Sequence, residues 1–265
     1  MGASAQNDVQ SIINAIRDSK GRIVNITSNY IDGEIDHRYL ETIKSFMESQ
    51  KIKHEIIQME YAIQGNSGRL TNTSLSGSNY NEKLDIVLIP EGYTKEEMNK
   101  FKEDTKKFAK YLLECSPYKE NANKINIWAV LAESKESGTD MPPLGVWKNT
   151  ILNSRFWTFK LERYLMIEDN KTLRNIASNV PYDQIYVIVN TNKYGGGAIY
   201  NHYAVCVREN TYENYVFVHE FGHAFAGLGD EYYTSSVAYN EFYKLDVEPW
   251  EPNLTTLVNF DKKWK

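Results

Sequence analysis

One stretch restricts the fold of this chain more than any other: residues 216–233, which read VFVHEFGHAFAGLGDEYY. The apolar spacing over residues 216–226 predicts a helix. In that helix His219 and His223 stand one turn apart on the same face. Two imidazole nitrogens in this arrangement can bind a single metal ion. We therefore expect the fold to be built around a metal-binding helix.

A catalytic zinc site needs a third protein ligand and one open position. A glycine-rich turn follows the predicted helix, and Asp230 comes directly after it, so we expect Asp230 to be the third ligand. Two alternatives stay open. Glu231 is adjacent to Asp230, but consecutive side chains after a turn point in different directions. Glu241 is the first well-separated carboxylate that a second helix further along the chain could provide as the ligand. No histidine follows His223, which excludes a downstream histidine ligand.

Glu220 directly follows the first histidine, which places its carboxylate beside the metal ion and not on it. There it can act as general base towards a water molecule whose pKa zinc lowers to roughly 7. Two histidines together with Glu220 indicate peptide hydrolysis, since binding alone has no use for Glu220. The alternative is a non-catalytic binding or adhesion module that retains a peptidase-like fold.

Four separated segments resemble the IgA-peptidase family of secreted bacterial zinc metallopeptidases. They are residues 219–232 (HEFGHAFAGLGDEY), 84–94 (LDIVLIPEGYT), 136–140 (ESGTD) and 190–200 (NTNKYGGGAIY). The similarity covers about residues 84–262 and keeps the family's order.

This resemblance implies a zincin-like, metzincin-related catalytic domain. It implies that His219, His223 and Asp230 bind Zn²⁺ and that Glu220 is the catalytic glutamate. It also implies a protein or peptide substrate and a secreted or cell-surface location. Immunoglobulin as the substrate does not follow from the resemblance, because a fold family can serve many substrates.

Composition narrows the possible partners. The 265 residues are 42% hydrophobic, enough to bury the core of one large domain, either alone or with a small appendage. A net charge of -5 argues against a nucleic-acid partner. No apolar run reaches the roughly 18 residues of a membrane span, and the first residues lack the apolar core of a signal peptide. We expect Cys115 and Cys206 to be buried free thiols.

Residues 1–83 read as a helical N-terminal appendage. Apolar residues recur at helical spacing over 9–16 and 40–47, and a strand is predicted near 53–59. The Gly-, Ser- and Asn-rich segment 65–81 predicts a flexible connection. Residues 84–265 form the predicted catalytic domain, which we expect to be truncated at its C-terminus.

The catalytic domain is predicted to be α+β, with a mainly parallel, twisted sheet. The expected elements are strands over 84–89, 125–131 and 185–189, a long backing helix over 94–115 capped by Thr94, and one edge strand over 198–207. Residues 132–184 read as irregular. Within them the acidic segment 136–140 is either a cation-binding or substrate-rim loop or a solvated turn, and the aromatic residues of 156–165 are expected to form an apolar plug.

The glycine run before the edge strand is the predicted substrate-binding segment. Consecutive glycines weaken a strand that only packs, whereas close approach of a ligand favours them. We predict that an extended peptide pairs with this segment by β-augmentation. Its residues are Gly195, Gly196, Gly197, Ala198, Ile199 and Tyr200. A hairpin turn is the alternative interpretation. Either Tyr200 or Tyr203 could stabilise an oxyanion, and His202 is a poor ligand candidate.

Overall fold

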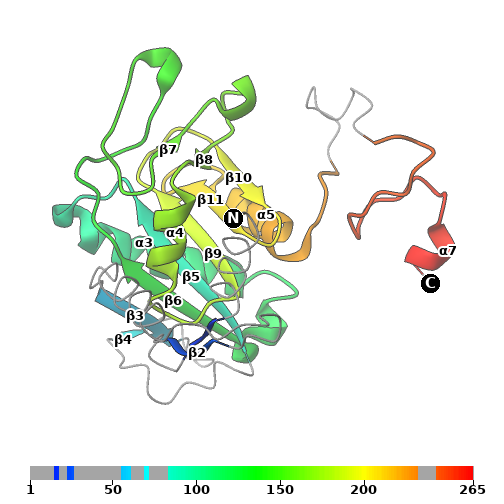
Figure 1. Cartoon of the computed structure of the whole chain (residues 1–265), viewed down its shortest axis with the longest axis horizontal. Coiled ribbons are helices and arrows are strands. Elements are labelled where there is room, and N and C mark those ends of the chain that lie inside the picture. Colours follow the sequence, from blue (N-terminus) through cyan, green and yellow to red (C-terminus); the bar gives the residue numbers. More distant parts are fainter. Residues whose placement is uncertain are drawn as a thin grey trace, which may run out of the picture.

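A computed structural model describes residues 15–17, 23–26, 55–60, 69–71, 83–231 and 243–264 of the chain. Its centre is a seven-stranded sheet with the strand order β10-β11-β9-β5-β6-β3-β4 (Figure 1). In that order the strands are Gly196–Ile199, Tyr203–Val207, Gln184–Val189, Leu84–Glu91, Ile125–Leu131, Glu55–Glu60 and Arg69–Thr71. The four strands β11, β9, β5 and β6 are parallel, whereas β10, β3 and β4 pair antiparallel to their neighbours. The sheet is therefore mostly parallel, as expected from the sequence.

The first strand and the helix after it follow the predicted pattern closely. β5 extends beyond the expected end at residue 89 and continues through Pro90, where β9 pairs with the strand and the pairing with β6 has already ended. Thr94 then starts the helical segment, and its N–H donates to the carboxylate of Glu97 (3.0 Å). The first turn is a 3₁₀ helix, η1 (Lys95–Glu97), and it leads into the long helix α3 (Met98–Leu113).

The prediction of one edge strand over residues 198–207 was wrong. The segment is a hairpin, in which β10 and β11 pair antiparallel with Ala198 opposite Ala204. Asn201 has a positive φ of 53° at the turn, and the N–H of His202 donates to the carbonyl of Ile199 (3.0 Å). Asparagine tolerates this left-handed backbone, which explains how a run of apolar residues can hold a tight turn.

Residues 132–184 contain one helix that the sequence reading missed. Helix α4 (Asn170–Ala177) buries Leu173 and Ile176, and Asp169 caps it by accepting a hydrogen bond from the N–H of Thr172 (2.9 Å). The expected aromatic plug is only partly correct, because Phe159 is 79% exposed. The remaining short elements are η2 (Lys119–Lys124), η3 (Pro142–Leu144), β7 (Ser154–Arg155), η4 (Thr158–Lys160), β8 (Met166–Ile167) and α7 (Phe260–Lys263).

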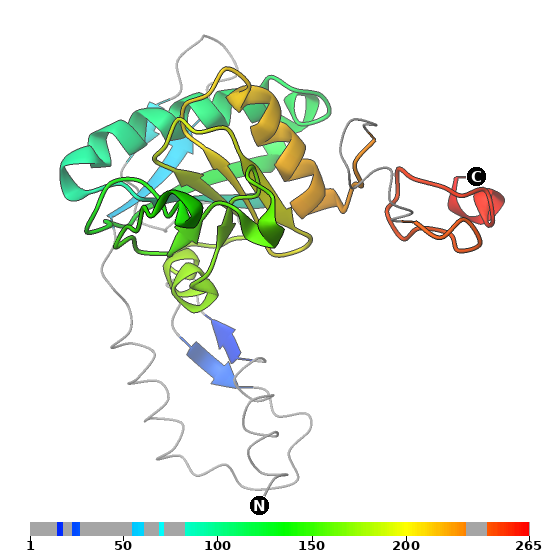
Figure 2. The ribbon, with the colours of Figure 1, turned by 90° about the horizontal axis from the view of Figure 1, so that it is seen from above.

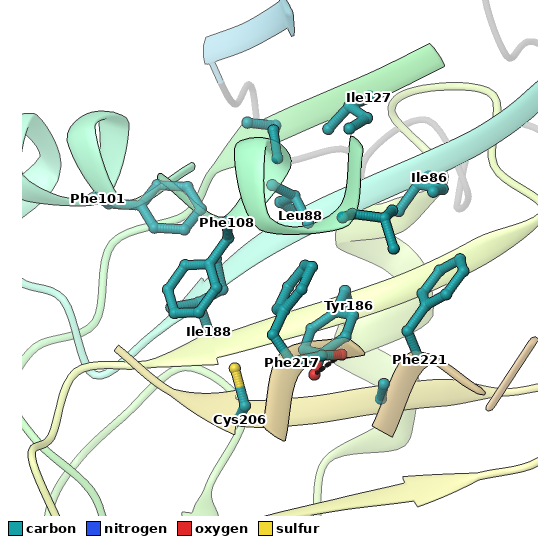
Figure 3. Packing of buried hydrophobic residues seen from close by; sticks show 14 of the residues in the cluster. Ile86, Leu88, Phe101, Phe108, Ile127, Tyr186, Ile188, Cys206, Phe217 and Phe221 are labelled. Carbon is teal, nitrogen blue, oxygen red and sulfur yellow. Dashed lines mark hydrogen bonds between the residues drawn. The ribbon is translucent and has the colours of Figure 1, made fainter. Parts of the chain in front are cut away.

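The sheet has helices on both faces, so the domain has three layers (Figure 2). Helices α3 and α5 (Glu213–Ala226) cover one face and α4 lies against the other. Side chains of β5 alternate between the two cores: Ile86 and Leu88 pack under α3 and α5, while Val87 and Ile89 pack under α4. Figure 3 shows the first of these cores around Tyr186 and Phe217.

The described parts of the N-terminal region are strands. Ile16 was expected in a helix but lies in β1 (Ala15–Arg17), which pairs with β2 (Ile23–Ile26). The strand expected near residues 53–59 is confirmed as β3, and it pairs with β6 of the main sheet. β4 lies within the segment expected to be a flexible connection. The predicted helix over residues 40–47 falls outside the described residues, and the domain boundary at residue 83 stays a prediction.

Two expectations about the whole chain can be compared with the described residues. Cys115 and Cys206 are both free thiols, as predicted, but the expected burial holds only for Cys206, because Cys115 is partly exposed. Within the same described ranges, every helix is too short or too polar to cross a lipid bilayer.

Candidate metal centre

Helix α5 is fixed to the sheet through its aromatic side chains. The ring of Phe217 stacks on Tyr186, with 4.1 Å between centroids, and it also contacts Phe108 of α3 (Figure 3). The hydroxyl of Tyr186 donates to the carbonyl of Phe217 (3.0 Å). Val216 and Phe221 bury the same face of the helix. This packing leaves the histidines of α5 on a partly exposed face.

A left-handed glycine ends α5 and turns the chain back towards it. Gly227 has a φ of 65°, and its N–H donates to the carbonyl of His223 (3.0 Å). The N–H of Leu228 donates to the carbonyl of Gly222 (3.3 Å). This pair of bonds is typical of a glycine-terminated helix. As a result, Asp230 comes back beside the helix and faces His223.

The structure brings together the three residues that the sequence proposed as ligands. The Nε2 atoms of His219 and His223 lie 3.0 Å apart, and Oδ1 of Asp230 lies 3.1 Å from each of them. Two ligand atoms, each about 2.0–2.1 Å from a tetrahedral zinc ion, lie roughly 3.3 Å apart. The donor set and its spacing therefore fit zinc. Among the described residues, this is the one His, Cys, Asp or Glu group that meets the spacing of a metal site.

A hydrogen bond orients the ring of His223, and a stacked ring contacts that of His219. Nδ1 of His223 donates to the carbonyl of Leu228, which leaves Nε2 directed at His219 and Asp230. The ring of Tyr215 stacks on His219, with 5.5 Å between centroids. Burial lowers the pKa of His223, but the bonds to Asp230 and Leu228 outweigh it and raise this pKa to about 9. Although burial opposes the effect, the two histidines hold the pKa of Asp230 far below its usual range.

Glu220 lies beside the group formed by His219, His223 and Asp230 and is not one of its three ligand residues. Burial raises the pKa of its carboxyl to about 7, the two histidines oppose the rise, and Asp230 adds to it. A carboxyl group with a pKa near neutrality is suited to accept a proton and return it. The Oε1 atom of Glu220 faces the main chain of Gly196 on the neighbouring strand β10.

The glycine run is explained by packing within the chain itself. A Cβ atom at Gly195 would lie 2.5 Å from the carbonyl oxygen of Arg163, and one at Gly197 would lie 2.9 Å from that of Leu165. A Cβ atom at Gly196 would lie 3.1 Å from Glu220. The glycines thus need no ligand to account for them, and their part in substrate binding stays a prediction.

The edge of β10 is partly open. The N–H of Gly196 donates to the carbonyl of Arg163 (3.2 Å), and its carbonyl accepts from the N–H of Leu165 (3.1 Å). Because main-chain groups alternate along a strand, the N–H and carbonyl of Ala198 face the same edge. Across the residues that the structure describes, Ala198 pairs with β11 alone. Ile199 and Tyr200 are 40% and 54% exposed.

Three other sequence candidates contact other parts of the chain. Tyr203 is fully buried under α4 and its hydroxyl accepts from the N–H of Ile167 (3.1 Å), so it does not face the histidines. Tyr200 packs against Trp250. His202 contacts Asn170 on α4 (3.0 Å).

The acidic candidates also differ in their surroundings. The carboxylate of Glu231 accepts a hydrogen bond from Asn253 (2.6 Å), and Glu241 falls outside the described residues. Glu136 accepts from the main chain of Asn149 (2.7 Å) and Asp140 from that of Lys148 (2.6 Å). These two carboxylates stabilise their own loop by hydrogen bonds within it. This favours neither a cation-binding loop nor a substrate-rim loop.

Sequence reasoning missed the contribution of the C-terminal segment. The side-chain amide of Asn253 bonds to the main chain of Gly229, next to Asp230. No local pattern marks Asn253, because its partners are more than twenty residues away in the sequence.

Comparison with known proteins adds one match. A family model described as IgA Peptidase M64 matches residues 74–265 of the chain. No curated protein matches the chain at a significant level.

Proposed function

Since the chain belongs to the IgA peptidase M64 family and is therefore a metallopeptidase acting on proteins, we propose that it is a zinc-dependent endopeptidase. The observation that carries this proposal is the triangle formed by His219, His223 and Asp230, whose ligand atoms lie 3.0–3.1 Å apart. Two imidazoles and one carboxylate, with Glu220 left outside the group, are the donors of an open catalytic zinc site.

A bound zinc ion would act as a Lewis acid, which polarises the peptide carbonyl and lowers the pKa of water. Glu220 would accept a proton from the attacking water as its oxygen bonds to the carbonyl carbon. Glu220 would then deliver this proton to the leaving amine as the C–N bond breaks. The pKa of about 7 supports both transfers.

We assign the substrate to the open edge of β10. An extended peptide paired with the N–H and carbonyl of Ala198 would lie next to α5, which carries Glu220. A mostly parallel sheet, an antiparallel edge strand and a backing helix α3 support a zincin-like arrangement. The family name makes immunoglobulin A the first substrate to test, and we propose a secreted or cell-surface location.

The replacement Glu220→Gln tests the proposal. We expect one zinc ion per chain by elemental analysis, as in the wild type, and at least a 10²-fold loss of peptide cleavage, because a general base contributes about 10²–10⁴-fold. Glu103→Gln, an exposed change on α3, is the matched control and should leave both unchanged. If wild-type protein binds a partner but cleaves nothing, and Glu220→Gln binds it equally well, the chain is instead a binding module.

A further inference from the structure

One side chain of the C-terminal segment holds the loop that carries Asp230. The Oδ1 atom of Asn253 accepts from the N–H of Gly229 (2.8 Å), and its Nδ2 donates to the carbonyl of Gly229 (2.9 Å). Nδ2 also contacts Oε1 of Glu231 (2.6 Å). The amide therefore bonds to the residues on both sides of Asp230.

The surrounding contacts leave this loop little room to shift. A Cβ atom at Gly229 would lie 2.5 Å from the side chain of Leu254 and 3.1 Å from the hydroxyl of Tyr243. That hydroxyl is itself bonded to the buried carboxylate of Glu251 (2.9 Å). Tyr243, Asn253 and Leu254 of the C-terminal segment thus all lie against Gly229.

The other main-chain bonds of this loop lie at its start, where the N–H groups of Gly227 and Leu228 donate to the end of α5. Leu228 and Asp230 are exposed, and Asp230 must be held within a few tenths of an ångström to stay near both histidines. A ligand carried on such a loop loses conformational freedom when it binds metal, unless another group has already fixed it.

We propose that Asn253 is a positioning residue that sets the metal affinity of the centre by fixing the main chain next to Asp230. This inference rests on the proposed metal site and goes beyond it, because it assigns a role to the C-terminal segment. Groups that orient metal ligands typically change affinity by about 10–100-fold when they are removed.

The test is zinc affinity, measured by competition with a chromophoric chelator, for wild type, Asn253→Ala, Asp230→Ala and the double variant. We expect Asn253→Ala to weaken zinc binding by about 10–100-fold at temperatures where circular dichroism shows a folded chain. In the Asp230→Ala background, the same change should cost less than about twofold, because Asn253 acts through Asp230.

Two further variants separate positioning from simple structural support. Asn179→Ala removes two side-chain bonds to the main chain of α4, so it should lower the melting temperature and leave zinc affinity unchanged. Glu231→Gln keeps both bonds between Asn253 and Gly229, and we expect affinity within about threefold of the wild-type value.

The outcomes distinguish this inference from the proposed function. Tight zinc binding that Asp230→Ala weakens and Asn253→Ala does not would overturn the role of Asn253 alone. An equal loss from Asn253→Ala with and without Asp230 would also overturn it. A folded wild-type chain that binds no zinc after supplementation would overturn both proposals.

Discussion

The main chain of Gly196 runs so close to Glu220 that a Cβ atom on this glycine would lie 3.1 Å from the carboxylate oxygen Oε1. The same Cβ atom would lie 2.9 Å from the side chain of Val216 and 3.0 Å from the carbonyl of Val205. Since the carbonyl is part of the sheet, Glu220 and Val216 would have to move. We expect Gly196→Ala to lower kcat by about 10²-fold, as small displacements of catalytic groups do, and to leave zinc bound.

A neighbouring glycine provides the control for this prediction. Gly222 lies on α5 itself, but an added Cβ atom would approach only the end of the Leu228 side chain (3.3 Å). We expect Gly222→Ala to keep kcat within about threefold, because a flexible side chain can give way. Equal activity of Gly196→Ala and wild type would show that Glu220 does not depend on this contact.

A second prediction concerns Asp230. Its carboxylate is the third donor of the group, and without it only the two imidazoles remain. Asp230→Ala should therefore weaken zinc binding by more than roughly 100-fold, which is the upper end of the effect of removing a group that only orients a metal ligand. Equilibrium dialysis followed by elemental analysis measures this loss. Asp246→Ala, an exposed carboxylate of the C-terminal segment, should bind zinc as the wild type does. Undiminished binding by Asp230→Ala would move the third ligand to Glu231 or Glu241.

The parts of the site that the sequence located depend on short-range geometry. His219 and His223 share one face of any helix of normal pitch. The left-handed glycine Gly227 then turns the chain so that Asp230 comes back towards them. The central strands were also found, because buried parallel strands are short continuous apolar runs.

The features that were missed depend on contacts distant in sequence or on a single backbone angle. The hairpin at Asn201 requires a positive φ, which an apolar run on both sides conceals. Helix α4 is an exception, because its cap Asp169 and the helical spacing of its buried residues Leu173, Ile176 and Ala177 were signals that the sequence offered. Asn253 could not be recognised, since nothing near it in the sequence indicates that it bonds to Gly229.

A third prediction concerns a buried ion pair that joins α3 to the loop before α5. Nε of Arg208 donates to Asp104 (2.7 Å), whose side chain is 4% exposed and also accepts from the hydroxyl of Tyr93 (2.8 Å). Arg208→Ala would leave this carboxylate buried, with Lys107 at 3.6 Å as its remaining cationic neighbour among the described residues. We expect the free energy of unfolding to fall by about 3 kcal/mol, as for other broken buried pairs.

Urea denaturation of the metal-free chain measures this loss. The double variant that combines Arg208→Ala with Asp104→Asn removes the uncompensated charge, so it should recover part of the lost stability. If Arg208→Ala lowers the free energy of unfolding by less than about 1 kcal/mol, this ion pair contributes no more to stability than exposed ion pairs do.

The last prediction is a pH dependence of stability that comes from Glu91. This side chain is fully buried at the end of β5, where its carboxylate accepts hydrogen bonds from the main chain of Leu152 (2.9 Å) and Ser154 (2.8 Å). Burial raises its pKa above the ordinary value of 4.5, although these bonds and that of Thr150 oppose the rise. The folded chain therefore retains a proton on Glu91 at pH values where the unfolded chain has lost it.

The sign of the effect follows from this difference. Because the folded state binds more protons, the free energy of unfolding decreases as the pH rises from 4.5 through the raised pKa. Glu91→Gln cannot titrate, so it lacks this decrease, whatever constant cost its altered hydrogen bonds add. We expect the stability of wild type relative to Glu91→Gln to fall as the pH rises from 4.5 through the raised pKa, as measured by urea denaturation with a chelator present. As the control, wild type and Glu103→Gln differ at an exposed site, so their difference in the free energy of unfolding should be nearly constant with pH. If the difference between wild type and Glu91→Gln were also constant, folding would leave the pKa of Glu91 unchanged.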